Sequence, residues 1–437
     1  MVRFKEVKIS LKSGFYSKCI HANVRYVLLV IMENSKKFSI LYLIGDRGLD
    51  LTKGEGFKIH VQKIIEGLQK KGHNVFLLTI NEKQSLSEFD SYLTVQHKYL
   101  RFFFHRLFPF TGTINSINIM LHIIKLNKIY QFNVIHERFG LYAFGGILAS
   151  RLLGIPHIIE INGPGIEEKK LFTKDIPPIQ KLTVKMIRKF CLQFTHHIIA
   201  VSNNLKNFLI ENSIVKDPNK IAVLPNAADT QAFDKDFDIA GIKKSLGLEG
   251  KFIIVYTGTL QVWYAIEDII SALPLVLREI PNAILLIVGE GQAREKLEKL
   301  SKELKITDKV RFTGYIDHMK IPEILSVADV VVAPFKELGM TFFGSAIKIF
   351  EYLSAGKPIV ATKIGQIAEI LQDQYTALLV EPSVVEEIAN AIIRLARDEQ
   401  LRSYLAKNAR IEAQKYSWDK YADQLENIYT TLLEDRR

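Results

Sequence analysis

The chain has 437 residues, of which 48% are hydrophobic and 24% charged, and a net charge of +11. This composition is typical of a soluble protein with roughly two or three domains of about 150 residues each. It excludes a disulfide-rich scaffold, because Cys19 and Cys191 are the only cysteines, and it favours a reducing, cytoplasmic compartment. The positive charge is spread without a basic arm or a zinc-ligand pattern, so we expect a phosphorylated small molecule or anionic lipid as partner, and no nucleic acid.

Residues 1–36 show no alternation of strands and helices. Their one apolar run, residues 27–32, is far shorter than the roughly 20 residues that span a bilayer. It is followed by the polar residues 33–37 without a small-residue cleavage site, which disfavours a signal peptide. We therefore expect residues 1–36 to be an extension outside the fold, with Met32 as a candidate start site.

From Phe38, short apolar runs alternate with helical periods, which is typical of a parallel sheet with crossover helices. Residues 38–44 are predicted to form a buried strand, and a helix with a regular apolar period follows as far as Gly72. Further strands are predicted at residues 74–80, 133–136, 157–161 and 197–201.

A second alternating series begins at Lys251, with strands predicted at residues 252–257, 284–288, 310–312, 330–333, 359–361 and 377–380. We therefore predict an α/β protein with two Rossmann-like domains facing each other across a cleft. The expected boundaries are residues 37–230 for the first domain, 231–250 for a polar linker, 251–415 for the second domain and 416–437 for a C-terminal helix.

The strongest local signal lies in residues 344–358. Ser345 is a suitable N-cap, Gly356 is placed to end the helix, and Pro358 prevents its continuation. The N-terminus of such a helix is ready to bind an anion. Lys348 and Glu351, three residues apart, would share one face, where they could bind a phosphate and a hydroxyl group side by side. The alternative is an exposed ion pair without a function.

Several segments, in the same order, resemble the family 4 retaining glycosyltransferases, which have the two-domain GT-B architecture. The segment that carries most of this resemblance is FEYLSAGKPIVA at residues 350–361. The others are GHNV at 72–75, HIIAVS at 197–202, LPNAAD at 224–229, IVGEG at 287–291, FTGYI at 312–316 and SW at 417–418. The resemblance implies that the last helix crosses back to the first domain.

The resemblance also implies roles in binding a nucleotide-sugar donor. Glu351 would accept hydrogen bonds from the ribose hydroxyls, and the backbone of Tyr315 and Ile316 would read the base. The family usually places Arg and Lys on the diphosphate after Gly258, where this chain has Thr259 and Tyr264. It usually has Glu at the position of Phe343. We expect Lys348 to replace the missing cations, with Arg138 or Lys58 acting across the cleft.

In the first domain, the resemblance and the sheet pattern together indicate four site residues. Gly56 would let backbone approach the diphosphate, and Arg138 follows a strand whose end lies at the ligand-binding edge. Glu160 and Asn162 follow the next predicted strand, and Asn162 stands where many family members have His. We expect Asn162, Glu160 and Lys348 to serve catalysis, although Glu160 could equally be a structural carboxylate.

These features predict retaining transfer of a sugar from a nucleotide diphosphate sugar to a glycan or lipid-linked acceptor, without a bound metal or cofactor. Two alternatives are a nucleotide-sugar 2-epimerase of the same architecture and a catalytically weak nucleotide-binding protein. Aromatic and basic residues interleave at residues 98–110 (KYLRFFFHRLFPF), which suits peripheral contact with an anionic membrane at the inner face of the cell membrane, unless these aromatic side chains are core.

Overall fold

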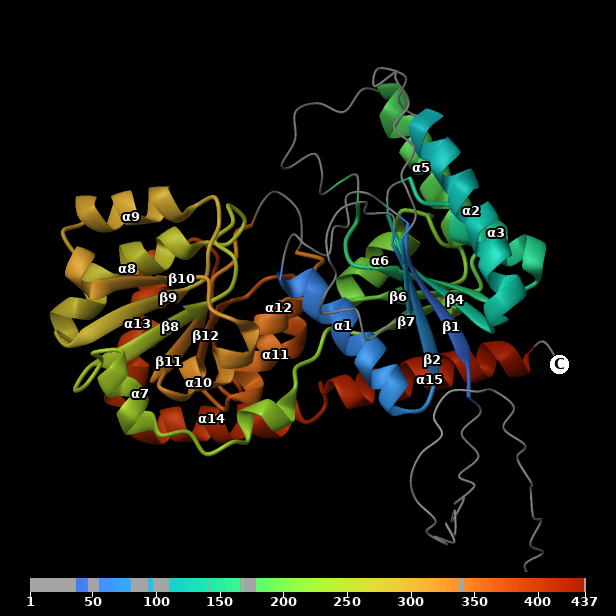
Figure 1. Ribbon diagram of the computed structural model, residues 1–437. Coiled ribbons are helices and arrows are strands. Elements are labelled where there is room, and N and C mark those ends of the chain that lie inside the picture. The colour runs from blue at the N-terminus through green and yellow to red at the C-terminus, as the bar shows by residue number, and fades with distance from the viewer. Residues whose placement is uncertain are drawn as a thin grey trace, which may run out of the picture. The chain divides into compact units, whose positions relative to one another are not determined.

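The computed structural model describes residues 37–45, 55–79, 93–96, 110–140, 142–165, 167, 178–337 and 342–435. Lys37–Arg437 form one compact unit that holds two parallel sheets (Figure 1). The predicted extension, residues 1–36, lies outside the described residues, and so does the aromatic and basic segment at 98–110 apart from Phe110 at the start of a helix.

The N-terminal sheet has seven strands in the order β3-β2-β1-β4-β5-β6-β7. Its strands are β1 (Ser39–Ile44), β2 (Asn74–Thr79), β3 (Leu93–Gln96), β4 (Val134–Arg138), β5 (His157–Ile161), β6 (His197–Ala200) and β7 (Ile221–Val223). All pair in parallel, which confirms the predicted strands and adds β3 and β7, the two edge strands.

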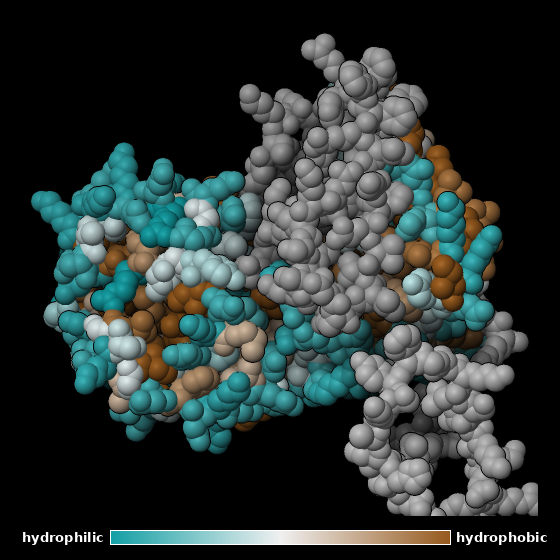
Figure 2. All heavy atoms as spheres, in the orientation of Figure 1, coloured by the Kyte–Doolittle hydropathy of each residue, from teal (hydrophilic) through white to brown (hydrophobic). Residues whose placement is uncertain are grey.

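Helices cover both faces of this sheet. On one face, α1 (Glu55–Lys70) and α15 (Trp418–Glu434) pack against β1 and β2 through Ile64, Leu425 and Tyr429, all buried. The other face is covered by α2 (Phe110–Tyr130), α3 (Gly145–Leu153), α5 (Pro178–Phe194) and α6 (Asn203–Glu211). Figure 2 shows apolar side chains in brown along the outer edge of the α2, α3 and α5 layer.

The C-terminal sheet has six strands in the order β10-β9-β8-β11-β12-β13. Its strands are β8 (Phe252–Thr257), β9 (Ala283–Val288), β10 (Val310–Gly314), β11 (Val330–Ala333), β12 (Ile359–Thr362) and β13 (Leu378–Val380). Counted within the sheet, this order is 3-2-1-4-5-6, which is that of a dinucleotide-binding doubly wound fold, and the N-terminal sheet has the same order with a seventh strand added at its edge. This confirms the predicted pair of Rossmann-like domains.

Two helical layers enclose the C-terminal sheet. One contains α8 (Ile266–Glu279), α9 (Arg294–Glu303) and α13 (Val385–Arg397), and the other contains α7 (Ile239–Ser245), α10 (Ile321–Ser326), α11 (Ile347–Ser354) and α12 (Gly365–Ile370). The helix α14 (Glu399–Ala413) contributes to both cores, through Leu405 and Ala409. Short 3-10 turns are η2 (Pro218–Lys220), η3 (Thr230–Phe233), η4 (Thr307–Lys309) and η5 (His318–Lys320).

The segment expected as a linker, residues 231–250, carries most of η3 and all of α7. Phe233, Ile242 and Leu248 are buried in the core beneath the C-terminal sheet, so this stretch packs as part of the second domain. The chain returns at the other end, because α15 lies against α1 and belongs to the core of the first domain (Figure 1).

Candidate functional site

A cavity of about 480 Å³ lies between the carboxyl ends of the two sets of strands. In sheets of this order, ligands bind at these ends, where the strand order reverses. Apart from Glu160 and Lys58, which was the alternative to Arg138, every residue that the sequence assigned to the site lines this one cavity: Gly56, Arg138, Asn162, Gly258, Thr259, Tyr264, Tyr315, Ile316, Lys348 and Glu351. Glu160 lies behind the cavity wall, fully buried.

Bare backbone forms the C-terminal wall of the cavity. Gly258, directly after β8, has a φ of +126°, and Gly289, directly after β9, has a φ of +143°. A Cβ on Gly289 would lie 2.0 Å from the Gly258 carbonyl oxygen, and a Cβ on Gly258 would lie 2.7 Å from Lys348 Nζ. Both positions therefore need glycine, which leaves the backbone open to close approach by a ligand.

Lys348 is a buried cation in this wall. Its Nζ donates a hydrogen bond to Tyr256 Oη at 2.8 Å and lies 4.0 Å from the ring centroids of both Tyr256 and Tyr264. Burial lowers the pKa of Lys348 to about 7, although the nearby Glu351 carboxylate opposes this shift. Tyr264 stands where the family usually has a lysine. Its ring contacts the ammonium group of Lys348, so it helps to hold a cation that comes from another element, α11.

Glu351, one helical turn beyond Lys348, is buried and is contacted by a histidine from another element. Its Oε1 lies 2.6 Å from Nε2 of His318, in η5. His318 also lines the cavity. Sequence reasoning missed His318, because no motif marked it and 33 residues separate it from Glu351.

The structure excludes one alternative for this helix and corrects one expectation. Lys348 and Glu351 are 7% and 5% exposed, so they are not an exposed surface pair. Ser345 does not cap α11, whose N-cap is Ala346. Instead, Ser345 Oγ accepts a hydrogen bond from the Asn226 backbone N–H at 2.9 Å, and its carbonyl accepts one from Asn226 Nδ2 at 2.6 Å. Ser345 therefore bonds to Asn226 of the first domain and does not cap its own helix.

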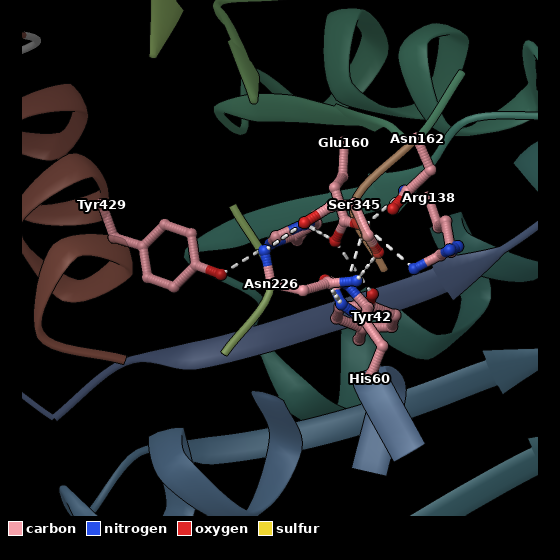
Figure 3. A network of polar contacts seen from close by, with 9 residues as sticks. Tyr42, His60, Arg138, Glu160, Asn162, Asn226, Ser345 and Tyr429 are labelled. Carbon is pink, nitrogen blue, oxygen red and sulfur yellow. Dashed lines mark hydrogen bonds and ion pairs between the residues drawn. The ribbon is translucent and has the colours of Figure 1, made fainter. Parts of the chain in front are cut away.

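Across the cavity, the first domain presents a buried polar cluster built around Glu160 (Figure 3). Glu160 Oε1 lies 2.9 Å from Arg138, 2.6 Å from Asn162 Nδ2 and 2.8 Å from His60 Nε2. Glu160 Oε2 accepts a hydrogen bond from Tyr42 and lies 3.4 Å from His136 Nε2. These cationic and donor partners outweigh burial and hold the pKa of Glu160 well below its usual range.

Arg138 and Asn162 are the members of this cluster that reach the cavity. The Arg138 guanidinium lies over the Phe57 ring, 4.6 Å from its centroid, beside Gly56 in the first turn of α1. Its Nε has no hydrogen-bond partner in the described part of the chain. Because Arg138 itself lines the cavity, its guanidinium group is placed to meet a ligand there.

Phe343, at the position where the family usually has Glu, does not line the cavity. Its ring packs against Phe208, with centroids 5.1 Å apart, and its carbonyl accepts a hydrogen bond from Ser202 at 2.8 Å. This residue helps to join the two domains.

Two family models match the chain, "Glycosyltransferase Family 4" over residues 55–232 and "Glycosyl transferases group 1" over residues 238–412. An uncharacterised glycosyltransferase of Methanocaldococcus jannaschii is 27% identical over 386 residues, which are 87% of this chain and 95% of that protein. The UDP-Gal:alpha-D-GlcNAc-diphosphoundecaprenol alpha-1,3-galactosyltransferase of Escherichia coli is 24% identical over 388 residues, or 86% and 96% of the two chains.

Solved structures share the fold. HepE of Anabaena, in complex with UDP and glucose, superposes with a TM-score of 0.71 at 17% identity, covering 90% of this chain and 99% of that one. Sucrose-phosphate synthase of Thermosynechococcus elongatus gives a TM-score of 0.70 at 20% identity, covering 91% and 99%.

Proposed function

The chain belongs to the group 1 glycosyltransferases of family 4, and on this premise we propose that it transfers a sugar, with retention, from a nucleotide diphosphate sugar to a glycan or lipid-linked acceptor. The observation that carries the proposal is the pairing of Lys348 and Glu351 on α11, one buried cation and one buried carboxylate in the wall of a single cavity. The relative in Escherichia coli is named for a lipid-linked acceptor, and HepE was solved with UDP.

Each wall of the cavity has its own task in this proposal. Glu351 accepts hydrogen bonds from the two ribose hydroxyls, and the backbone at Tyr315 and Ile316 meets the base. The diphosphate lies against the backbone of Gly258 and the N-terminal turn of α11, where Lys348 and Arg138 neutralise it from opposite sides.

The reaction breaks the bond between the anomeric carbon and the diphosphate oxygen and forms a bond from that carbon to the acceptor oxygen. Asn162 faces the cavity from the acceptor side, but an amide does not take up a proton at neutral pH. The proton of the acceptor hydroxyl therefore passes to the departing phosphate oxygen. Lys348 and Arg138 stabilise the charge that develops on that oxygen.

The test is a panel of nucleotide sugars and free nucleotides, followed by melting temperature and then by calorimetry. A selective rise in melting temperature identifies the donor, since a ligand that binds the folded state stabilises it. Nucleotide release that depends on an acceptor then supports transfer. A donor altered without an acceptor would indicate an epimerase, and binding without turnover would indicate a binding protein; either result contradicts the proposal.

We also propose that the protein works at the surface of an anionic membrane. In the described part of the chain no helix is long and apolar enough to span a bilayer. The layer of α2, α3 and α5 holds two, one and four Lys or Arg residues respectively and no acidic residue. It also carries nine of the sixteen large apolar side chains that are exposed among the described residues. Cationic and apolar side chains on one surface suit anionic lipid headgroups.

On α5 the exposed apolar row is Ile179, Leu182, Met186, Phe190 and Phe194, and Lys185 and Lys189 lie exposed beside it. Flotation with anionic vesicles tests this surface. We expect Lys185→Glu with Lys189→Glu to reduce recovery, whereas Lys299→Glu with Lys302→Glu, on α9, leaves it unchanged. Equal recovery with neutral and anionic vesicles would contradict the membrane proposal.

A further inference from the structure

Two buried histidines, His60 (Figure 3) and His136, flank the Glu160 carboxylate, and they differ in the partner of their second ring nitrogen. His60 Nε2 lies 2.8 Å from Glu160 Oε1, and its Nδ1 lies 2.6 Å from Asn226 Oδ1. His136 Nε2 lies 3.4 Å from Glu160 Oε2, and its Nδ1 lies 2.7 Å from Tyr429 Oη. Both rings are at most 1% exposed, so solvent cannot satisfy either nitrogen.

The proton count of each ring follows from its partners. Asn226 Nδ2 donates to the Ser345 carbonyl at 2.6 Å, which fixes Oδ1 as the amide atom that faces His60. Amide and carboxylate oxygens only accept hydrogen bonds. His60 Nδ1 lies within hydrogen-bonding distance of the amide oxygen, whereas the contact of Nε2 with Glu160 has the distance of an ion pair without the angle of a hydrogen bond. A bare lone pair on Nε2 would face a carboxylate oxygen at 2.8 Å, so the site favours two protons on His60. The Tyr429 hydroxyl can donate to His136 Nδ1, so one proton is sufficient for that ring.

The second proton belongs to His60. Glu160 already accepts hydrogen bonds from Arg138 and Asn162. Its pKa is held well below the usual range, so the carboxyl group stays ionised. Burial lowers the pKa of His60 below its usual value, although Glu160 and Asn226 oppose this shift. The charge of the imidazolium is nevertheless matched in place by a carboxylate 2.8 Å away. The other groups around the ring are Arg138 and the edges of Trp418 and Tyr421.

We propose that Glu160 and a doubly protonated His60 form a buried ion pair whose task is to position Arg138 and Asn162 at the cavity and to leave the charge of Arg138 uncancelled. With His60 charged, Glu160, His60 and Arg138 together carry a net charge of +1. With a neutral His60 the sum is zero, and Glu160 alone would neutralise Arg138. The role of the extra charge, which is to face the donor diphosphate, rests on the proposed function.

The same pair also connects the two domains. From His60, the hydrogen bonds continue through Asn226 to Ser345, two residues before α11 begins. On the other side of the pair, Glu160 holds the two residues that reach the cavity. Glu160 and His60 are therefore positioning residues, because both are fully buried and neither lines the cavity.

The protonation state can be measured without an enzyme assay. We expect nitrogen NMR of the wild-type chain with labelled histidine to show His60 with both ring nitrogens protonated at about pH 8, above the ordinary histidine pKa of about 6.5. His136 should show one protonated nitrogen under the same conditions. His60→Gln and His136→Gln assign the signals, and proximity to the Trp418 ring assigns His60 if its variant does not fold. A singly protonated His60 would overturn the proposal, whatever the enzyme transfers.

The positioning role needs a kinetic test with a matched control. Glu160→Gln should lower kcat by about 10²-fold through misplacement of Arg138 and Asn162. Its affinity for a nucleoside monophosphate should change less than about twofold, because Glu351 and the base-binding backbone lie on the other domain. The control is Glu137→Gln, since Glu137 is also buried and paired with a histidine, His157, at 2.9 Å, but lies away from the cavity.

If Glu160→Gln and Glu137→Gln lose kcat equally, the Glu160 pair is only structural and the positioning role is wrong. If the wild-type chain binds no nucleotide, the proposed function fails instead, while the NMR result for His60 still stands or falls by itself.

Discussion

The carboxyl ends of the two sheets face the same cavity, but they are built from opposite kinds of residue. In the C-terminal sheet, Gly258 and Gly289 directly follow β8 and β9, and their missing side chains leave bare backbone. In the N-terminal sheet, Arg138 is the last residue of β4 and Glu160 the last but one of β5. Glu160 collects five polar side chains around one carboxylate. The same strand order thus provides space on one side and fixed charge on the other.

This difference indicates how the site divides its work. A large ligand such as a nucleotide diphosphate needs room, and the glycines provide it because they have no side chains. In exchange, each glycine loses more conformational entropy on folding than any other residue. A small group such as an acceptor hydroxyl needs fixed partners, and a fully paired polar cluster holds them rigidly. Lys348 is the exception, a buried cation in the glycine wall, and the following predictions start from it.

We expect Lys348→Ala to have the largest effect. It removes the cation that lies 2.8 Å from Tyr256 Oη in the C-terminal wall, where the leaving diphosphate gains charge in the transition state. Turnover should fall by about 10²–10³-fold, as when one electrostatic stabiliser is lost. Steady-state kinetics measure this effect. Unchanged turnover in a folded variant would show that the glycine wall needs no cation.

Gly258→Ala should have the next largest effect on turnover. The new Cβ would lie 2.7 Å from Lys348 Nζ, on a backbone with a φ of +126°. Displacing the ammonium group should lower turnover by about 10²-fold. In the Lys348→Ala background the same substitution should cost much less turnover, since the two changes share one interaction. Additive losses in the double variant would contradict this account.

Glu351→Gln should act on binding more than on turnover. The amide keeps one acceptor oxygen but loses the charge-assisted hydrogen bonds to ribose, which should weaken nucleotide binding by about 1.5–3 kcal/mol. Calorimetry with a free nucleoside diphosphate should show the same loss, because the ribose is present without the sugar. His318→Ala is the companion variant, since it frees Glu351 Oε1 without removing the carboxylate. Unchanged nucleotide affinity in Glu351→Gln would show that α11 has a structural role and does not bind the nucleotide.

The smallest expected effect concerns stability and pH. The folded pKa of Lys348, about 7, lies below the ordinary lysine value of 10.5, so between these values the unfolded chain binds more protons than the folded chain. The free energy of unfolding of the wild type therefore rises with pH in this window, and the cost of the buried lysine is fully present below about pH 7. Lys348→Met should raise Tm by roughly a few degrees at neutral pH, with a shrinking advantage toward pH 9. Calorimetric melting at both pH values checks this, and an advantage that grows with pH would refute it.

The fold was largely predictable because its strands are long apolar runs of residues that favour strands. The predicted bounds of β5, β8 and β11 agree with the structure. The edge strands β3 and β7 escaped prediction; in β3 (LTVQ) polar residues alternate with apolar ones and leave no apolar run. The resemblance to family 4 found most cavity residues, because they lie within its motifs.

The polar partners of these residues were not predictable in the same way. The side chain of Ser345 has the chemistry of an N-cap, but it bonds to Asn226, 119 residues away. His318 reaches Glu351 only because η5 folds back beside α11. The burial of Glu160 depends on His60, from α1, and on Arg138 and His136, from β4. Such contacts depend on the tertiary structure and leave no local pattern.

The path of α15 has a consequence for the synthesis of the chain. This last helix fills the core of the first domain with Leu425 and Tyr429, and Tyr429 Oη lies 2.7 Å from His136, a neighbour of Glu160. A ribosome that has finished residues 37–230 has therefore made a domain that still lacks one of its walls. That domain keeps an open apolar face until α15 emerges, so a chain terminated before α15 exposes this face and becomes a substrate for chaperones or proteases. The emergence of α15 is thus itself a folding step for the half that was translated first.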